Sequence, residues 1–171
     1  MTIKDLLTSE YSPYFQTYIN QVDNKPLLQC LEEGKAATEA FFSSIPEDKQ
    51  EYRYAEAKWT PKEILLHLAD SERMFCYRAM SFARTDNANL PGYDENEFAS
   101  NSNANERSMD DIIAEFSSVR SATISLFRSF SNETLVRKGR ANNNLLSVRA
   151  AGFLICGHEI HHRKVISERY L

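Results

Sequence analysis

Histidine is the residue type in this chain with the clearest potential for chemistry, and its four copies fall in only two segments. His158 and His162 are four residues apart, so on a helix their imidazoles would lie about one turn apart on the same face and could bind one metal ion. A third ligand would have to come from another helix, where His67 is available. The spacing therefore predicts a metal site made of three histidines.

Helical periodicity indicates which histidines face inward. Five apolar residues define the core-facing stripe of the helix predicted around His158: Ala151, Leu154, Ile155, Val165 and Ile166. At about 100° per residue, His158 and His162 fall in the middle of this stripe. His161 falls about 60° from His158, at the margin, and adjacent residues diverge too far to share an ion easily. His67 lies at the edge of its own helix's stripe, about 60° from Ile64. We expect His161 to be a rim group and the other three histidines to be ligands.

Two alternatives to this site follow from the same residues. A histidine on an apolar face is often only a hydrogen-bonded core residue, although burying two of them side by side without an ion leaves several ring nitrogens to satisfy. Thiolate is also a strong zinc ligand. However, Cys156 falls about 140° from the centre of its stripe, and Cys76 falls about 180° around its helix from His67. We therefore expect both to be ordinary thiols.

The bulk composition limits the possible partners. A chain of 171 residues with 42% hydrophobic and 26% charged residues is expected to form one domain over 1–171. A net charge of −4 without a basic cluster excludes nucleic acid as an expected partner. No segment approaches the roughly 18 apolar residues that span a bilayer, and no signal peptide is evident. The three cysteines are odd in number and widely spaced, so we expect a cytoplasmic protein.

The apolar spacing predicts an all-α protein. Four long helices are expected over residues 26–44, 61–84, 109–130 and 147–171, with a shorter N-terminal helical segment over 3–22 that Pro13 interrupts. The second has the clearest start, with Thr60 as N-cap, Pro61 at the first position and Glu63 completing a capping box. No stretch has the alternating β-branched pattern of a strand. These elements predict a four-helix bundle with one long crossover loop.

Two segments outside the long helices have open roles. The crossover loop over 85–108 is rich in Asn, Asp and Ser and has a turn at Pro91 and Gly92. It is either a solvated connector or a cover for a site. The N-terminal segment carries four aromatic residues: Tyr11, Tyr14, Phe15 and Tyr18. They could form the surface of a homodimer or cover the bundle.

Three segments of the chain are distinctive: WTPKEILLHLADSERMFCYRAMSFARTD, LPGYDENEF and GHEIHHRKVISERYL. In these segments, and over nearly its whole length, the chain resembles the DinB/YfiT-like superfamily of bacterial metal-binding four-helix bundles. It implies one histidine from the second helix and two from the last as ligands of a divalent ion, which correspond to His67, His158 and His162. The remaining coordination positions would be open to water. The metal would be Zn, Ni or Fe, since imidazole sites accept each of these.

The resemblance also implies an activity. Characterised relatives are S-transferases that use low-molecular-weight thiols such as bacillithiol, and a mycothiol-dependent isomerase. An ion bound by three neutral imidazoles is a strong Lewis acid, and a thiol that binds to it loses its proton. We expect the thiolate to attack an electrophilic small molecule held under the loop that contains Tyr93 and Asp94.

Two other functions remain open. The ion could activate water for hydrolysis, with a carboxylate as base; the candidates are Asp70, Glu72, Asp94 and Glu159. Alternatively, the ion could be structural in a non-catalytic interaction protein, with a fourth ligand such as His161 or Glu63. A carboxylate close to the site would favour hydrolysis, whereas an apolar pocket without one would favour thiol transfer. Glu63, Asp70 and Ser71 are also candidates to orient the imidazoles from outside the ligand set.

Overall fold

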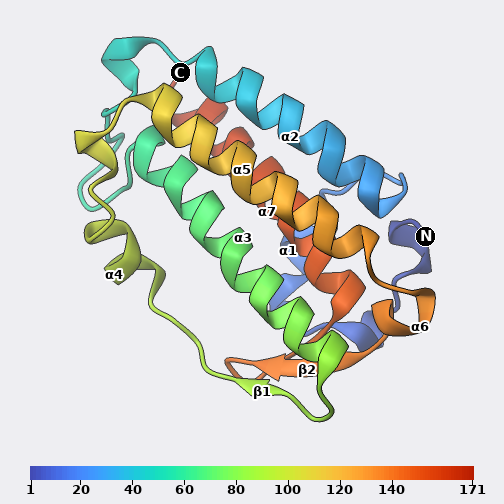
Figure 1. The fold of residues 1–171 in the computed structure, drawn as a ribbon. Helices are drawn as coiled ribbons and strands as arrows, with labels where there is room; N and C mark the ends of the chain where they lie inside the picture. Colours follow the sequence, from blue (N-terminus) through green and yellow to red (C-terminus); the bar gives the residue numbers. More distant parts are fainter.

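Four long helices form the body of the molecule. The computed structural model describes all residues, 1–171. Its long helices are α2 (Leu27–Ser43), α3 (Pro61–Arg84), α5 (Met109–Arg128) and α7 (Val148–Arg169) (Figure 1). Three short helices accompany them: α1 (Gln16–Ile19), α4 (Glu95–Ser100) and α6 (Asn132–Leu135). The predicted four-helix bundle is therefore confirmed, with helix ends within two residues of the expected positions.

The order of the helices around the bundle requires the long crossover. α3 packs against α5 and α7, and α2 packs against the same two helices, so α2 and α3 lie on a diagonal. Figure 1 shows that α3 and α5 run in the same direction. The chain over 85–108 therefore has to return along the bundle before α5 can begin. It carries α4 on the way, beside α3.

Hydroxyl caps fix where the helices that carry the histidines begin. At the start of α3, Thr60 Oγ1 accepts a hydrogen bond from the backbone N–H of Glu63, and the Glu63 carboxylate accepts one from the backbone N–H of Thr60. This is the predicted capping box. At the start of α7, Ser147 Oγ accepts a hydrogen bond from the backbone N–H of Ala150. These caps define the positions at which α3 and α7 leave their loops.

The core of the bundle is divided by a polar layer. One apolar cluster contains Phe82, Phe153 and Leu154, and a second contains Phe42, Leu65 and Phe116 at the other end. Between them, every long helix contributes small or polar residues, which are Gly34 and Thr38 on α2, Ser71 and Glu72 on α3, Arg120 on α5, and His158, Glu159 and His162 on α7. The histidines thus lie halfway along the bundle. No helix combines the length and apolar content needed to cross a membrane.

The expectation of no strands was wrong. A small sheet of β1 (Asn89–Leu90), β2 (Lys138–Ala141) and β3 (Asn144–Ser147) closes one end of the bundle, with β1 parallel and β3 antiparallel to β2. The β2–β3 connection has two residues, Asn142 and Asn143, and both have positive φ angles of 49° and 61°. Asparagine tolerates this conformation, which a type I′ hairpin turn requires. The sequence contains this turn, but the strands beside it are too short and polar to show strand periodicity.

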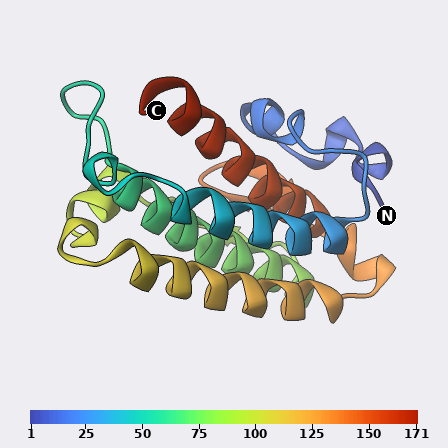
Figure 2. The same cartoon turned by 90° about the horizontal axis from the view of Figure 1, so that it is seen from above.

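The N-terminal segment covers the outer side of α7 (Figure 2). Tyr11 and Phe15 are buried, whereas Tyr14 remains exposed. A β-carbon on Gly157 of α7 would overlap the backbone of Tyr18, so the glycine permits the close approach of α1. A buried ion pair also holds the segment against α7, because Arg149 Nε donates a hydrogen bond to Glu10 Oε2 at 2.7 Å. Most of these aromatic residues therefore cover the bundle.

Candidate metal centre

The structure brings His67, His158 and His162 together in the polar layer. The Nε2 atom of His158 lies 3.2 Å from Nε2 of His67 and 3.0 Å from Nε2 of His162. One donor nitrogen from each of the three rings falls within 4.8 Å of the other two. His158 is thus the central residue of a cluster that we call the histidine cluster, made of these three residues.

Two of the three spacings between these nitrogens fit a shared transition-metal ion. Nitrogen ligands about 2.1 Å from one ion, at angles between octahedral and tetrahedral, are separated from each other by about 3.0–3.4 Å. The two Nε2–Nε2 distances fall within this range. No carboxylate or thiol belongs to the group, so the donor set is imidazole only. Such a set suits zinc, nickel or iron better than calcium or magnesium, which prefer oxygen ligands.

Burial keeps the three imidazoles neutral, as metal ligands must be. His67 is buried, and burial lowers its pKa to about 4. Burial also lowers the pKa of His158 well below its usual value, and the neighbouring His162 and His67 lower it further. The pKa of His162 is lowered in the same way, first by burial and then by His67. All three rings therefore offer lone pairs at neutral pH.

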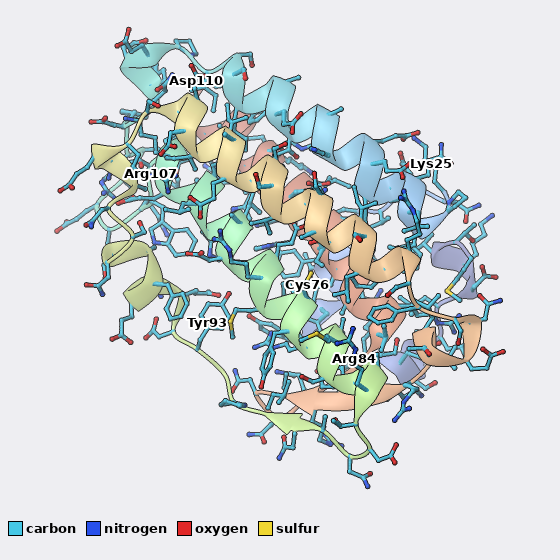
Figure 3. All side chains as sticks on the ribbon, viewed as in Figure 1. Lys25, Cys76, Arg84, Tyr93, Arg107 and Asp110 are labelled. Atoms are coloured by element: carbon cyan, nitrogen blue, oxygen red, sulfur yellow. The ribbon has the colours of Figure 1, made fainter.

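The surroundings of His67 hold its ring in place. The indole of Trp59 packs on the imidazole, with ring centroids 4.5 Å apart. Ser71 Oγ lies 3.5 Å from His67 Nδ1, and it also lies 2.9 Å from the hydroxyl of Tyr93. Tyr93 comes from the crossover between β1 and α4 (Figure 3). The crossover therefore contacts Ser71, which in turn lies beside the predicted ligand His67.

The residues considered as a fourth ligand lie elsewhere. His161 is half-buried and packs against Tyr18, with ring centroids 5.2 Å apart, and it does not join the histidine cluster. Glu63 completes the capping box and accepts hydrogen bonds from Arg53 at 2.7 Å and Asn105 at 3.0 Å. Neither residue is placed to be a fourth ligand. Glu63 was expected to orient the His67 ring, but it forms no hydrogen bond to that ring.

Two of the candidate bases have structural partners outside the histidine cluster. Asp70 accepts a hydrogen bond from Arg73 at 2.9 Å near the surface. Asp94 is the N-cap of α4, where its carboxylate accepts from the backbone N–H groups of Asn96 and Glu97. Neither carboxylate joins the three rings. The geometry therefore gives no support to either residue as a base or, for Asp70, as a partner of the imidazoles.

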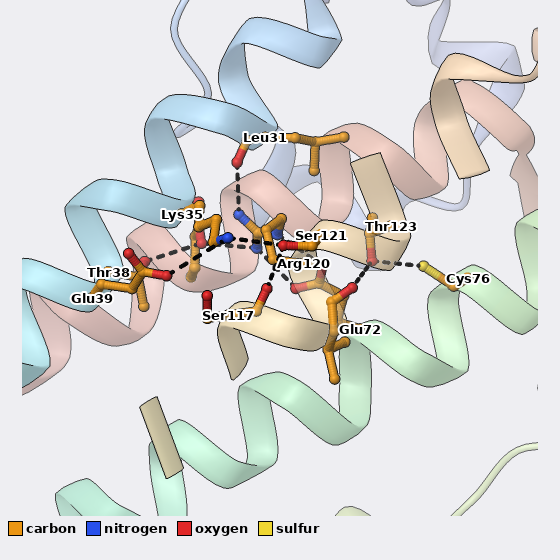
Figure 4. Close-up of polar contacts among 12 residues, drawn as sticks. Leu31, Lys35, Thr38, Glu39, Glu72, Cys76, Ser117, Arg120, Ser121 and Thr123 are labelled. Carbon is orange, nitrogen blue, oxygen red and sulfur yellow. Dashed lines mark hydrogen bonds and ion pairs between the residues drawn. The ribbon is translucent and has the colours of Figure 1, made fainter. Parts of the chain in front are cut away.

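The other two candidate bases belong to a buried ion network around Arg120 (Figure 4). Arg120 donates to both carboxylate oxygens of Glu72, at 2.7 and 2.9 Å, and to Glu159 at 2.9 Å. Thr38 also donates to Glu159, at 3.0 Å. A β-carbon on Gly34 would overlap the Glu159 carboxylate, so the glycine makes room for it. Both carboxylates are thus occupied as structural partners of a buried guanidinium.

The cysteines are not part of the histidine cluster, as expected from the helical wheel. Cys156 is buried in the apolar core, and burial raises the pKa of its thiol well above the usual range. Cys76 Sγ lies 3.1 Å from Thr123 Oγ1, on the side of α3 that faces α5 (Figures 3 and 4). Burial raises its pKa to about 11. Neither thiol is suited to act as a nucleophile or a zinc ligand in this state.

A pocket with a volume of about 90 Å³ reaches the histidine cluster at His158. About half of its wall is aromatic or aliphatic, including Phe75 and Tyr93, and the polar part includes Ser71, Arg78, Glu95, Asn142 and Asn144. The sequence analysis missed Arg78 and the two asparagines. Arg78 follows His67, Ser71 and Phe75 at helical spacing on one face of α3, so this position could have been recognised. The asparagines reach the pocket only through the unpredicted hairpin.

Comparison with known proteins agrees with this architecture. The structure is similar to that of YfiT from Bacillus subtilis, described as a probable metal-dependent hydrolase with an unusual four-helix bundle topology. The TM-score is 0.74 at 20% sequence identity, over 83% of this chain and 82% of that chain. No curated protein matches the chain by sequence. The sequence profile of the DinB superfamily matches residues 31–166, and the chain therefore belongs to the DinB superfamily.

Proposed function

We propose that this protein is a metal-dependent enzyme that activates a small thiol for transfer to an electrophilic carbon. The observation that carries the proposal is the convergence of three neutral imidazoles, two buried and one half-buried, beside a pocket that reaches His158. His67, His158 and His162 would hold one divalent transition-metal ion. Such an ion, when bound, supplies a Lewis acid with open positions that lowers the pKa of a thiol or water.

The pairing of the carboxylates that come from the long helices supports thiol transfer over hydrolysis. A hydrolase needs a group that takes a proton from water, and the carboxylates of Asp70, Glu72 and Glu159 all pair with arginines. The aromatic rings of Phe75 and Tyr18 lie beside His158, with ring centroids 6.4 and 5.4 Å away, and they limit the entry of water. Exclusion of water from this position reduces the competition between water and a thiol for the ion.

Hydrolysis is the second candidate function, and one comparison favours it. The structurally similar YfiT is described as a probable metal-dependent hydrolase. The carboxylate on the wall of the pocket is Glu95, which is exposed and has no ion-pair partner. Glu95 is therefore the residue to test as a base if hydrolysis is observed.

The test is conjugation of a small thiol to monochlorobimane by protein loaded with zinc or nickel. We expect a new sulfur–carbon bond with release of chloride, detected by fluorescence and confirmed by mass spectrometry. The His162→Ala variant should show only the uncatalysed rate, whereas His161→Ala should remain active. Ester and amide hydrolysis are measured on the same preparations. No conjugation with any thiol, together with hydrolysis that depends on His162 and Glu95, would replace the first function by the second.

A further inference from the structure

Arg78 is a buried arginine without an anionic partner. Its exposed fraction is only 7%, and it forms no ion pair. Its Nε atom has no hydrogen-bond acceptor. The other buried arginines of the protein differ: Arg120 pairs with Glu72 and Glu159, and Arg149 pairs with Glu10. A buried charge without a partner is costly, so an unpaired guanidinium requires an explanation.

The position of Arg78 offers that explanation, because it lines the pocket that reaches His158. The guanidinium carbon lies 5.4 Å from the ring centroid of Phe75 and 5.9 Å from that of Tyr93. These cation–π contacts hold the side chain but provide no hydrogen-bond acceptor for its planar N–H groups. A guanidinium held between two aromatic rings presents a fork of donors that matches a carboxylate.

We propose that Arg78 anchors the carboxylate group of a small-molecule substrate that occupies the pocket beside the histidine cluster. This inference rests on the proposed function, since the substrate that Arg78 holds is the one that reacts at the cluster. Arg78 would be a binding and specificity residue, and the anion would supply the partner that the folded chain lacks.

The length of α3 defines where the carboxylate lies on the substrate. Arg78 comes 11 residues after His67, a separation of about 16 Å along the helix axis. Eleven residues are close to three full turns, so both side chains leave the same face of α3. Arg78 lines the pocket, and His158, which contacts His67, connects the pocket to the histidine cluster. The anionic group is therefore remote from the reacting atom, and it positions the substrate without taking part in bond making.

A carboxylate fits the pocket better than a phosphate. Glu95 also lines the pocket, and its negative charge would oppose a dianion more strongly than a monoanion. The small volume of about 90 Å³ suits a compact planar head group. Asn142 and Asn144 on the wall add neutral amide donors for the same oxygens.

The test follows the side-chain Nε–Hε signal of Arg78 by ¹H–¹⁵N NMR in the metal-free full-length protein. The signal is assigned by its loss in Arg78→Met and, if that variant does not fold, in Arg78→Lys. Sodium propionate is titrated at constant ionic strength and compared with neutral propionamide. We expect a saturable shift with propionate and an affinity about 10-fold or more above that for propionamide.

Three results would overturn the inference. The first is an absent or non-saturable response to propionate. The second is a stronger response to inorganic phosphate than to propionate, which would assign a different anion. The third is a Glu95→Gln variant whose Nε–Hε signal moves, without any ligand, in the direction opposite to the propionate shift, since Glu95 would then already be the anionic partner of Arg78. The titration needs no metal, so a saturable propionate response alongside failed conjugation would refute the proposed function only.

Discussion

His158 and Glu159 are adjacent in the sequence, but their side chains leave α7 toward different neighbours. The His158 ring faces His67 and His162, whereas the Glu159 carboxylate accepts hydrogen bonds from Arg120 and Thr38. The polar layer therefore has two halves, the histidine cluster and the ion network around Arg120, and adjacent residues of α7 join them. One half offers metal donors, and the other ties three other helices to α7 at the same level.

The first prediction concerns the identity of the ligands. Because His158 Nε2 contacts both other rings, His158→Ala or His162→Ala should abolish stoichiometric metal binding. Wild-type protein purified without a histidine tag should contain about one equivalent of metal per chain, measured by inductively coupled plasma mass spectrometry. His161→Ala is the matched control, and it should keep the metal. Equal loss in all three variants would contradict the assignment.

The second prediction concerns the stability of the metal-free protein in acid. Burial lowers the pKa of His67 to about 4, whereas an exposed histidine in the unfolded chain titrates near 6.5. Between these values the unfolded chain binds more protons, so the free energy of unfolding rises with pH. It should fall by about 3 kcal/mol from His67 alone as the pH decreases from 6.5 to 4. His162 and His158 shift in the same direction and add to the effect.

Urea unfolding at a series of pH values in the presence of a chelator measures this effect. His67→Gln provides the comparison, because glutamine does not titrate and the variant should lose less stability on acidification than the wild type. Parallel pH profiles for the two proteins would show that His67 titrates normally in the folded state.

The third prediction concerns the ion network. Arg120→Met would leave the carboxylates of Glu72 and Glu159 buried without their cation. The free energy of unfolding should fall by about 3–5 kcal/mol. Arg128→Met on the same helix is the control; it removes an exposed pair with Glu32 and should cost less than about 1 kcal/mol. Urea unfolding of both variants decides the question, and similar small losses would show that the network is dispensable.

The histidine cluster could be predicted because its placement depends on local helical geometry. The i, i+4 spacing of His158 and His162 already places both rings on one face of α7, and the apolar stripe indicates that this face is inward. Only the choice of His67 as third member required a contact between helices. The capping box at Thr60 was recognisable for the same reason, since its hydrogen bonds join residues three apart.

The features that were missed depend on contacts between distant segments. Glu159 and Glu72 looked like candidate bases because their partner, Arg120, lies on a third helix and no spacing rule connects them. The sheet was missed because each strand has four residues or fewer. The helical spacing of Arg78 could have placed it on the face of His67, but only the structure shows that its guanidinium has no partner.

The fourth prediction concerns the contact between the crossover and the histidine cluster. Ser71 Oγ lies near both His67 Nδ1 and the Tyr93 hydroxyl. Ser71→Ala should weaken metal affinity by about 10-fold, since groups that orient ligand imidazoles typically contribute this much. Ser118→Ala, an exposed serine on α5, should leave affinity unchanged. Competition with a chelating dye measures both values, and unchanged affinity in Ser71→Ala would show that Trp59 packing alone holds the ring.

The fifth prediction concerns the hairpin that carries two residues of the pocket wall. Asn143 has a φ angle of 61° in the β2–β3 turn, a conformation that glycine adopts freely and β-branched residues avoid. Asn143→Gly should leave the free energy of unfolding within about 0.5 kcal/mol of wild type, whereas Asn143→Val should lower it by about 1–2 kcal/mol. Urea unfolding tests the order of the variants.

Because Asn142 and Asn144 flank Asn143 and line the pocket, Asn143→Val should also weaken propionate binding at Arg78, while metal content stays unchanged. Loss of metal in Asn143→Val would instead show that the hairpin supports the histidine cluster itself.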